Sequence, residues 1–177
     1  KRQIPETVIV FGGPNYPTTK DEQERYLRAL PMVDFYIVKE GEVAFAKLTE
    51  ALIANDFDAE RISDSLPSLH RIDARGKFLV SDTVERIWDL TQIPSPYLTG
   101  RMDEFFDGTM LPIIQTNRGC PFRCTFCIEG LSYYSRVAKS THEKVEAEIF
   151  YIAKRMAALR DDARGRTDLH IADSNFG

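Results

Sequence analysis

The first part of the chain alternates between short apolar runs and segments whose apolar residues have a helical spacing. Residues 7–11 and 34–38 are apolar runs with β-branched and aromatic side chains, which predicts two buried strands. Residues 21–30 between them have a helical pattern that ends at Pro31, and a second helix is predicted after the second strand. One face of this second helix carries Phe45, Leu48 and Leu52. The order strand, helix, strand, helix predicts an α/β fold with a parallel sheet covered by helices.

The pattern then changes to that of a connector, which we place at residues 66–110. Residues 69–72 and 77–80 flank Gly76 and predict a β-hairpin. Two prolines within residues 93–100 predict a rigid, extended segment.

The last part of the chain predicts a second α/β segment. Residues 111–116 and 169–172 are predicted strands, and residues 142–159 between them are a predicted helix. Ser140 and Glu143 have the spacing of a capping box at the start of this helix. The apolar stripe expected to pack into the core consists of Val145, Ile149, Ile152, Met156 and Leu159.

Composition narrows the classes of function. The 177 residues are 43% hydrophobic and 28% charged, which is typical of a globular protein, and the net charge is −4. Basic residues do not cluster, so we expect no nucleic-acid partner. No apolar run reaches the length of a membrane span and no signal peptide is visible, so we expect no membrane and a cytoplasmic location. Because a strand lies close to each end, we expect the chain to be a fragment of a longer protein.

All three cysteines of the chain lie within eight residues, at Cys120, Cys124 and Cys127. Thiolates are the usual protein ligands of iron–sulfur clusters. Three of them hold three corners of a [4Fe–4S] cluster and leave the fourth iron open to a ligand that is not protein. The spacing therefore predicts a catalytic cluster.

Three other structures could explain these cysteines. Disulfides do not suit an odd number of cysteines in a chain without a secretion signal. A zinc-stabilised binding module remains an alternative, although it is disfavoured because zinc needs a fourth ligand and none of the histidines has a typical ligand spacing. The candidates for that ligand are His70, His142 and His170. An iron–sulfur protein that only transfers electrons is disfavoured, because the chain has no fourth cysteine.

The cysteine spacing and residues 115–122, which lead into it, resemble the signature of the radical S-adenosylmethionine (radical SAM) superfamily. The resemblance implies a [4Fe–4S] cluster whose open iron binds S-adenosylmethionine (SAM), and it places Phe126 beside the adenine. It also implies that residues after the second strand hold the amino group of SAM. The residues at that place are Asp173, Ser174 and Asn175.

The first part of the chain resembles the cobalamin-binding domain that precedes many radical SAM domains. The resemblance rests on residues 8–14, 33–36 and 40–42, and on the Ile-Pro-Ser-Pro-Tyr stretch that starts at Ile93. It implies that Gly12 and Gly13 lie near the nucleotide tail of cobalamin.

The implied fold is the C-terminal part of a Rossmann-like cobalamin-binding domain, followed by the first βαβ unit of a partial TIM barrel. The domains would be residues 1–65, the connector at 66–110, and the truncated barrel at 111–177.

The implied activity is reductive cleavage of SAM to a 5′-deoxyadenosyl radical, used for cobalamin-dependent methylation of an unactivated carbon. Oxidative cyclisation or rearrangement is the alternative within the superfamily. The implied partners are a small-molecule or natural-product substrate and an electron donor such as flavodoxin or ferredoxin. The fragment alone is expected to be inactive.

Overall fold

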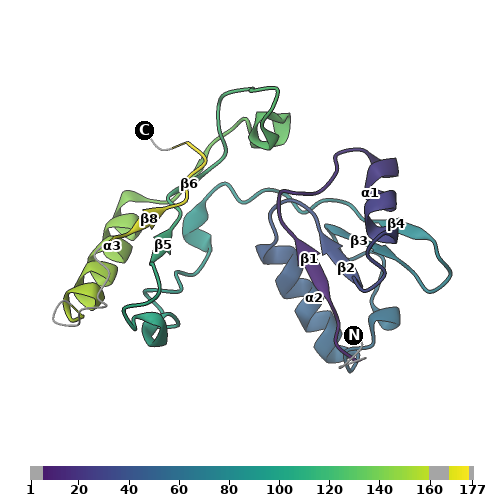
Figure 1. The fold of residues 1–177 in the computed structure, drawn as a ribbon, viewed down its shortest axis with the longest axis horizontal. Coiled ribbons are helices and arrows are strands. Elements are labelled where there is room, and N and C mark those ends of the chain that lie inside the picture. Colours follow the sequence, from purple (N-terminus) through teal and green to yellow (C-terminus); the bar gives the residue numbers. More distant parts are fainter. Residues whose placement is uncertain (1–5, 160–167, 176–177) are drawn as a thin grey trace. The chain divides into compact units, whose positions relative to one another are not determined.

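The computed structural model describes residues 6–159 and 168–175, which fall into two compact units, Lys1–Arg86 and Ile87–Gly177 (Figure 1). Each unit has a core of its own. The functional division of the chain at residues 65 and 110 stays a prediction. Within the described ranges, no helix is both long and apolar enough to cross a membrane.

The first unit contains a four-stranded sheet. Its strands, in spatial order, are β1 (Val10–Gly12), β2 (Phe35–Ile37), β3 (Leu69–Ile72) and β4 (Phe78–Val80). β1 and β2 are parallel, as the sequence predicts. The predicted hairpin is confirmed as β3 and β4, and it extends the sheet because β3 pairs antiparallel with β2.

β2 is the centre of this unit because both of its faces are buried. Phe35 and Ile37 lie in one apolar cluster with Leu48 of α2 (Glu42–Ala54). Tyr36 lies in a second cluster with Leu27 of α1 (Lys20–Arg28). Successive side chains of a strand point to opposite faces, so one apolar run serves both helices.

The second unit contains a parallel pair of strands with a helix between them in the chain. β5 (Ile113–Ile114) pairs with β8 (His170–Ile171), and α3 (His142–Ala157) packs on them through Ile152. The predicted strand–helix–strand unit is thus confirmed. A second small sheet pairs β6 (Asn117–Arg118) antiparallel with β7 (Ala138–Lys139). The 3₁₀ turns of the two units are Ala59–Arg61, Leu90–Gln92, Asp103–Phe105, Ile128–Gly130 and Ser132–Tyr134.

Two details of α3 differ from the prediction. The predicted capping box is wrong by one position, since Thr141 is the N-cap and its side chain accepts a hydrogen bond from the N–H of Lys144. Ile149, predicted to be in the core, is 39% exposed, whereas Glu148 is only 8% exposed. Position 148 lies four residues before the fully buried Ile152 and therefore shares its face.

Tyr97 of the connector forms hydrogen bonds with the edge of β5 that does not pair with β8. The hydroxyl of Tyr97 donates to the carbonyl of Ile113 at 2.8 Å and accepts from the N–H of Ile113 at 2.9 Å. These two backbone groups are not used in pairing with β8, where Pro112 and Ile114 supply the carbonyls. One buried tyrosine therefore takes the place of a neighbouring strand.

We expect Tyr97→Phe to lower the free energy of unfolding by about 1–3 kcal/mol, because it leaves two backbone groups of Ile113 without partners. Urea denaturation followed by circular dichroism measures the change. The matched control is Tyr26→Phe, because Tyr26 is half-buried and its hydroxyl has no hydrogen bond among the described residues. Equal stability of the two variants would contradict the role of Tyr97.

Candidate functional site

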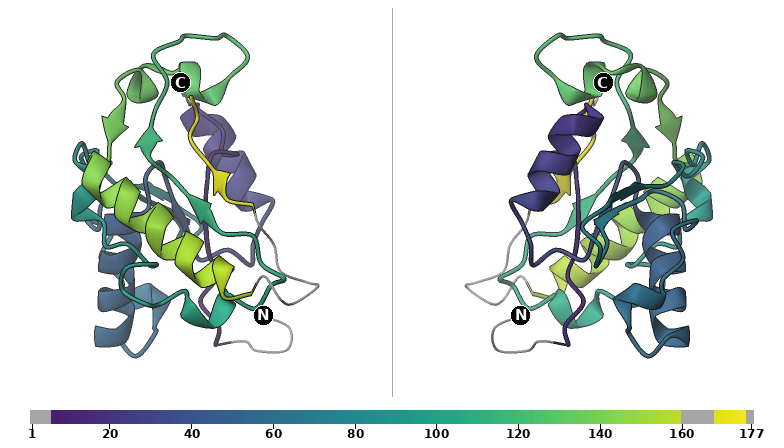
Figure 2. Two further views of the ribbon diagram at one scale, coloured as in Figure 1. Left: turned by 90° about the vertical axis from the view of Figure 1, so that its left-hand side faces the viewer. Right: turned by 90° about the vertical axis from the view of Figure 1, so that its right-hand side faces the viewer.

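The three cysteines lie in one loop, residues 119–137, which we call the cysteine loop and which is flanked by one pair of strands. Arg118 of β6 lies opposite Ala138 of β7, and the loop between them is green in Figures 1 and 2. Next to this strand pair, at the base of the loop, the N–H of Cys120 donates to the carbonyl of Tyr134 at 3.0 Å. The three cysteines therefore lie in a single loop that is closed at its base.

A tight turn organises the part of the loop that follows Cys124. The N–H of Cys127 donates to the carbonyl of Cys124 at 3.2 Å, and the N–H of Gly130 donates to the carbonyl of Cys127 at 3.0 Å. A Cβ atom at Gly130 would lie 2.3 Å from the carbonyl oxygen of Cys124. Only glycine therefore fits this close approach.

The thiols are free of disulfides, with Cys120 half-buried and Cys124 and Cys127 exposed. Within the part of the chain that the structure describes, no three Cys, His, Asp or Glu side chains come together as a metal-binding group. The donor set nevertheless has the chemistry of a cluster site, with three available thiols in one closed loop. The assignment of these cysteines as cluster ligands stays a prediction.

Asp173, which follows β8, is held by the residues that follow β5. Its Oδ1 accepts hydrogen bonds from the backbone N–H groups of Thr116 at 2.7 Å and Asn117 at 3.1 Å. Its Oδ2 accepts from the hydroxyl of Thr116, and from the side-chain amide of Asn117 at 2.8 Å. Parallel pairing of β5 and β8 brings these strand ends together.

The other residues predicted to contact SAM are open to solvent. Ser174 and Asn175 are exposed, and the side chain of Phe126 is 91% exposed. Two buried polar atoms, Oδ1 of Asn117 and Oε2 of Glu129, have no hydrogen-bond partner among the described residues. The contacts of Phe126, Asp173, Ser174 and Asn175 with SAM stay predictions.

Gly12 is the last residue of β1 and Gly13 follows it, and both are exposed. Gly13 has a φ of 107°, a conformation that favours glycine, and a Cβ atom there would project into open space. The hydroxyl of Tyr36 donates to the carbonyl of Gly13 at 3.1 Å and fixes this turn. The strand end thus presents bare backbone, which suits a flat ligand at the carboxyl end of a parallel strand. Cobalamin as that ligand stays a prediction.

Aromatic side chains support this turn. The rings of Tyr16 and Tyr36 stack with centroids 3.8 Å apart, and the hydroxyl of Tyr16 lies 3.0 Å from Nδ1 of His70. Burial raises the pKa of Tyr36 to about 12 and lowers the pKa of His70 to about 4. These tyrosine and histidine side chains are therefore uncharged near neutral pH.

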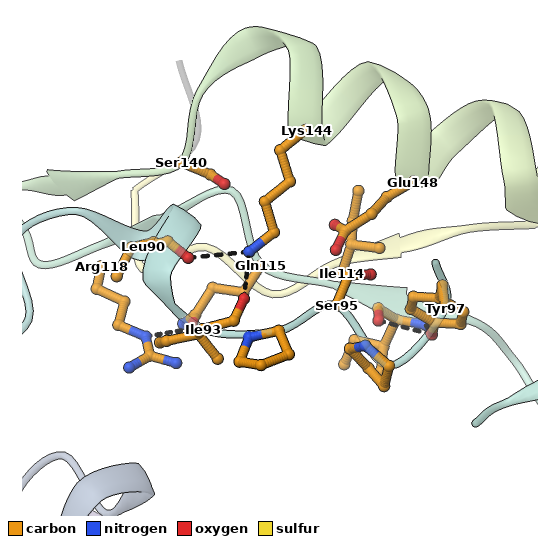
Figure 3. Close-up of a pocket in the computed structure, with 13 residues that line it drawn as sticks. Leu90, Ile93, Ser95, Tyr97, Ile114, Gln115, Arg118, Ser140, Lys144 and Glu148 are labelled. Carbon is orange, nitrogen blue, oxygen red and sulfur yellow. Dashed lines mark hydrogen bonds between the residues drawn. The ribbon is translucent and has the colours of Figure 1, made fainter. Parts of the chain in front are cut away.

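A pocket of about 170 Å³ lies where the connector packs against β5 and α3 (Figure 3). Nζ of Lys144 donates to the carbonyls of Leu90 at 2.9 Å and Ile93 at 2.5 Å, which ties α3 to the connector. The buried Glu148 also lines the pocket. Neither residue was predicted from the sequence, where the only signal is a pair of opposite charges spaced four positions apart on one helix face.

Comparisons with known proteins test the resemblance that the sequence predicts. No protein-family model matches the chain. The cobalamin-dependent radical SAM methyltransferase TokK of Streptomyces tokunonensis is 31% identical over the whole chain. The 2-(S-pantetheinyl)-carbapenam-3-carboxylate methyltransferase of Streptantibioticus cattleyicolor is 30% identical, also over the whole chain. The chain is therefore homologous to one part of these cobalamin-dependent radical SAM methyltransferases.

The similarity covers a limited part of these relatives, since the chain spans 24% of the length of each methyltransferase. An anaerobic magnesium-protoporphyrin IX monomethyl ester cyclase of Synechocystis is 26% identical over 86% of the chain and 29% of its own length.

Solved structures of cobalamin-dependent radical SAM enzymes share the fold. The enzyme OxsB, solved with aqua-cobalamin and SAM, matches 96% of the chain and 21% of its own chain with a TM-score of 0.61 at 18% identity. The methyltransferase TsrM of Kitasatospora setae matches 98% of the chain and 31% of its own with a TM-score of 0.57 at 19% identity. The chain therefore shares its mixed α/β fold with part of these enzymes, as the sequence predicts.

Because His70 is buried, we expect the stability of the chain to depend on pH. Below pH 6.5 the unfolded chain binds a proton at His70, whereas the folded chain does so only near pH 4. The free energy of unfolding therefore falls as the pH drops from 6.5 to 4, by up to about 3 kcal/mol from this residue. We expect His70→Gln to remove that part of the pH dependence in urea denaturation at pH 7 and pH 4.5.

A His70→Gln variant that loses as much stability on acidification as the original chain would contradict the assignment.

Proposed function

We propose that the protein containing this chain is a cobalamin-dependent radical SAM methyltransferase. The observation that carries the proposal is the match of the whole chain to two methyltransferases at 31% and 30% identity. The closed loop with Cys120, Cys124 and Cys127 supports it, because its donor set suits an iron–sulfur cluster.

The residues of this chain would bind and orient the cofactors. Cys120, Cys124 and Cys127 would hold a [4Fe–4S] cluster, and the exposed Phe126 would cover the adenine of SAM. When bound, the cluster supplies the electron for reductive cleavage of SAM, and cobalamin supplies the methyl group for an unactivated carbon. The bare backbone of Gly12 and Gly13 would lie against the cobalamin nucleotide tail.

Oxidative cyclisation or rearrangement is the second candidate activity. The observation that favours it is the 26% identity to a protein named as an anaerobic cyclase. For either activity we propose a small-molecule substrate, such as a natural product, and a flavodoxin or ferredoxin as the electron donor. A reduced cluster and free thiols suit the cytoplasm, which we propose as the location.

The test of the cluster uses the full-length protein, purified and reconstituted without oxygen. We expect a reduced [4Fe–4S] signal in EPR that shifts on addition of SAM. Cys124→Ala should abolish the signal because it removes one of three ligands, while Thr125→Ala next to it should retain it. A diamagnetic protein that holds one zinc ion, or a cluster that does not respond to SAM, would overturn the proposal.

The cobalamin site is tested separately with two glycine variants of the first unit. Gly13→Ala should lower the cobalamin content of the purified protein, measured by absorbance, because a methyl group enters the proposed contact surface. Gly76→Ala is the matched control, since Gly76 also has a positive φ and open space around it but lies in the β3–β4 turn. Equal cobalamin content of the two variants would contradict the assignment of Gly13.

A further inference from the structure

The carboxylate of Asp173 has no acceptor position left for a ligand. An ionised carboxylate has two oxygens with about four acceptor positions in total. Oδ1 accepts from two backbone N–H groups, and Oδ2 accepts from a hydroxyl and an amide. All four donors belong to Thr116 and Asn117. An ammonium group of a ligand would have to displace one of them.

Thr116 and Asn117 stand at the junction from which the cysteine loop leaves. They follow β5, and Asn117 begins β6, whose end leads directly to Gly119 and Cys120. The carbonyl of Thr116 also accepts from the N–H of Ser140 at 2.9 Å, just after β7. The carboxylate therefore connects the end of β8 to the start of β6, and the carbonyl of Thr116 connects the same junction to the end of β7.

The side chain of Asn117 shows that Asp173 controls its orientation. Nδ2 of Asn117 points to the carboxylate, and Oδ1 is left buried without a partner among the described residues. Turning the amide over would bring its oxygen against the carboxylate oxygens, which is repulsive. The charged hydrogen bond to Asp173 thus outweighs the cost of the unpaired oxygen.

We propose that Asp173 is a positioning residue, which fixes the exit of the cysteine loop from the barrel strands, and does not bind the amino group of SAM. This inference rests on the proposed function insofar as the loop carries a cluster. The hydrogen bonds on which it depends are formed by the protein alone.

The first experiment measures the loop in the full-length protein without a cluster. In Asp173→Asn the amides of Thr116 and Asn117 lose a charged acceptor, so their hydrogen exchange should become about tenfold faster. The control is Asp107→Asn, because Asp107 also accepts from a backbone N–H and a threonine hydroxyl, both of Thr109 close by in the chain. It should leave these two amides unchanged.

The second experiment separates positioning from SAM binding in the reconstituted protein. We expect Asp173→Asn to release iron to a chelator about tenfold faster and to broaden the EPR signal of the reduced cluster. The affinity of the remaining cluster for SAM should stay within about twofold. Thr116→Val should act in the same direction, and combining it with Asp173→Asn should add little, because both remove the same contact.

The outcomes are distinguishable. SAM affinity weakened tenfold or more with unchanged iron release and unchanged amide exchange would make Asp173 a SAM ligand and overturn the proposal. Unchanged exchange, iron release and EPR signal would overturn it as well. A protein that never takes up iron would refute the proposed function, while the exchange experiment would still decide whether Asp173 holds the junction.

Discussion

Strands of two to four residues leave backbone N–H and C=O groups that no neighbouring strand pairs, and buried groups of this kind must find other partners. Side chains supply these partners in both units of the chain. The carboxylate of Asp34 accepts from the N–H of Ile9, and the hydroxyl of Ser81 pairs with both backbone groups of Leu69. The rest of the architecture depends on such contacts, because the sheets are too small to be held by ladder hydrogen bonds alone.

The same requirement explains where the candidate sites lie. A side chain that completes a strand end also determines the direction in which the chain continues. Tyr36 does this for the turn at Gly13, through its hydroxyl, and it belongs to the strand next to that turn. Some of the residues that organise a candidate site are therefore found on neighbouring strands, outside the loop that would bind the ligand. Mutations in such residues would change the proposed cofactor site although they do not touch it.

Sequence patterns predicted the elements, the parallel pairs and the hairpin, because burial of apolar faces decides these features. They did not predict contacts that depend on a single polar atom. Ile149 of α3 was expected in the core because it is apolar, yet the rotation of the helix that buries Ile152 also buries Glu148 and leaves Ile149 exposed. The pairing of Tyr97 with Ile113 has no local signal either. The motif around Cys124 predicted the chemistry of the loop, but spacing alone says nothing about the turn that Gly130 permits.

The two sides of the loop junction lie far apart in the sequence, and this has a consequence for biosynthesis. Thr116 and Asp173 are 57 positions apart, and α3 lies between them. A ribosome therefore releases the cysteines well before it releases the carboxylate that holds their strand. Until then the loop has its local turns and the β6–β7 pair but lacks the carboxylate at its base, and its thiols are accessible to oxidants and to stray metal ions. The iron–sulfur cluster proposed for this loop would therefore be delivered after Asp173 has closed the junction, which would make the order of folding and metal loading part of the maturation of the protein.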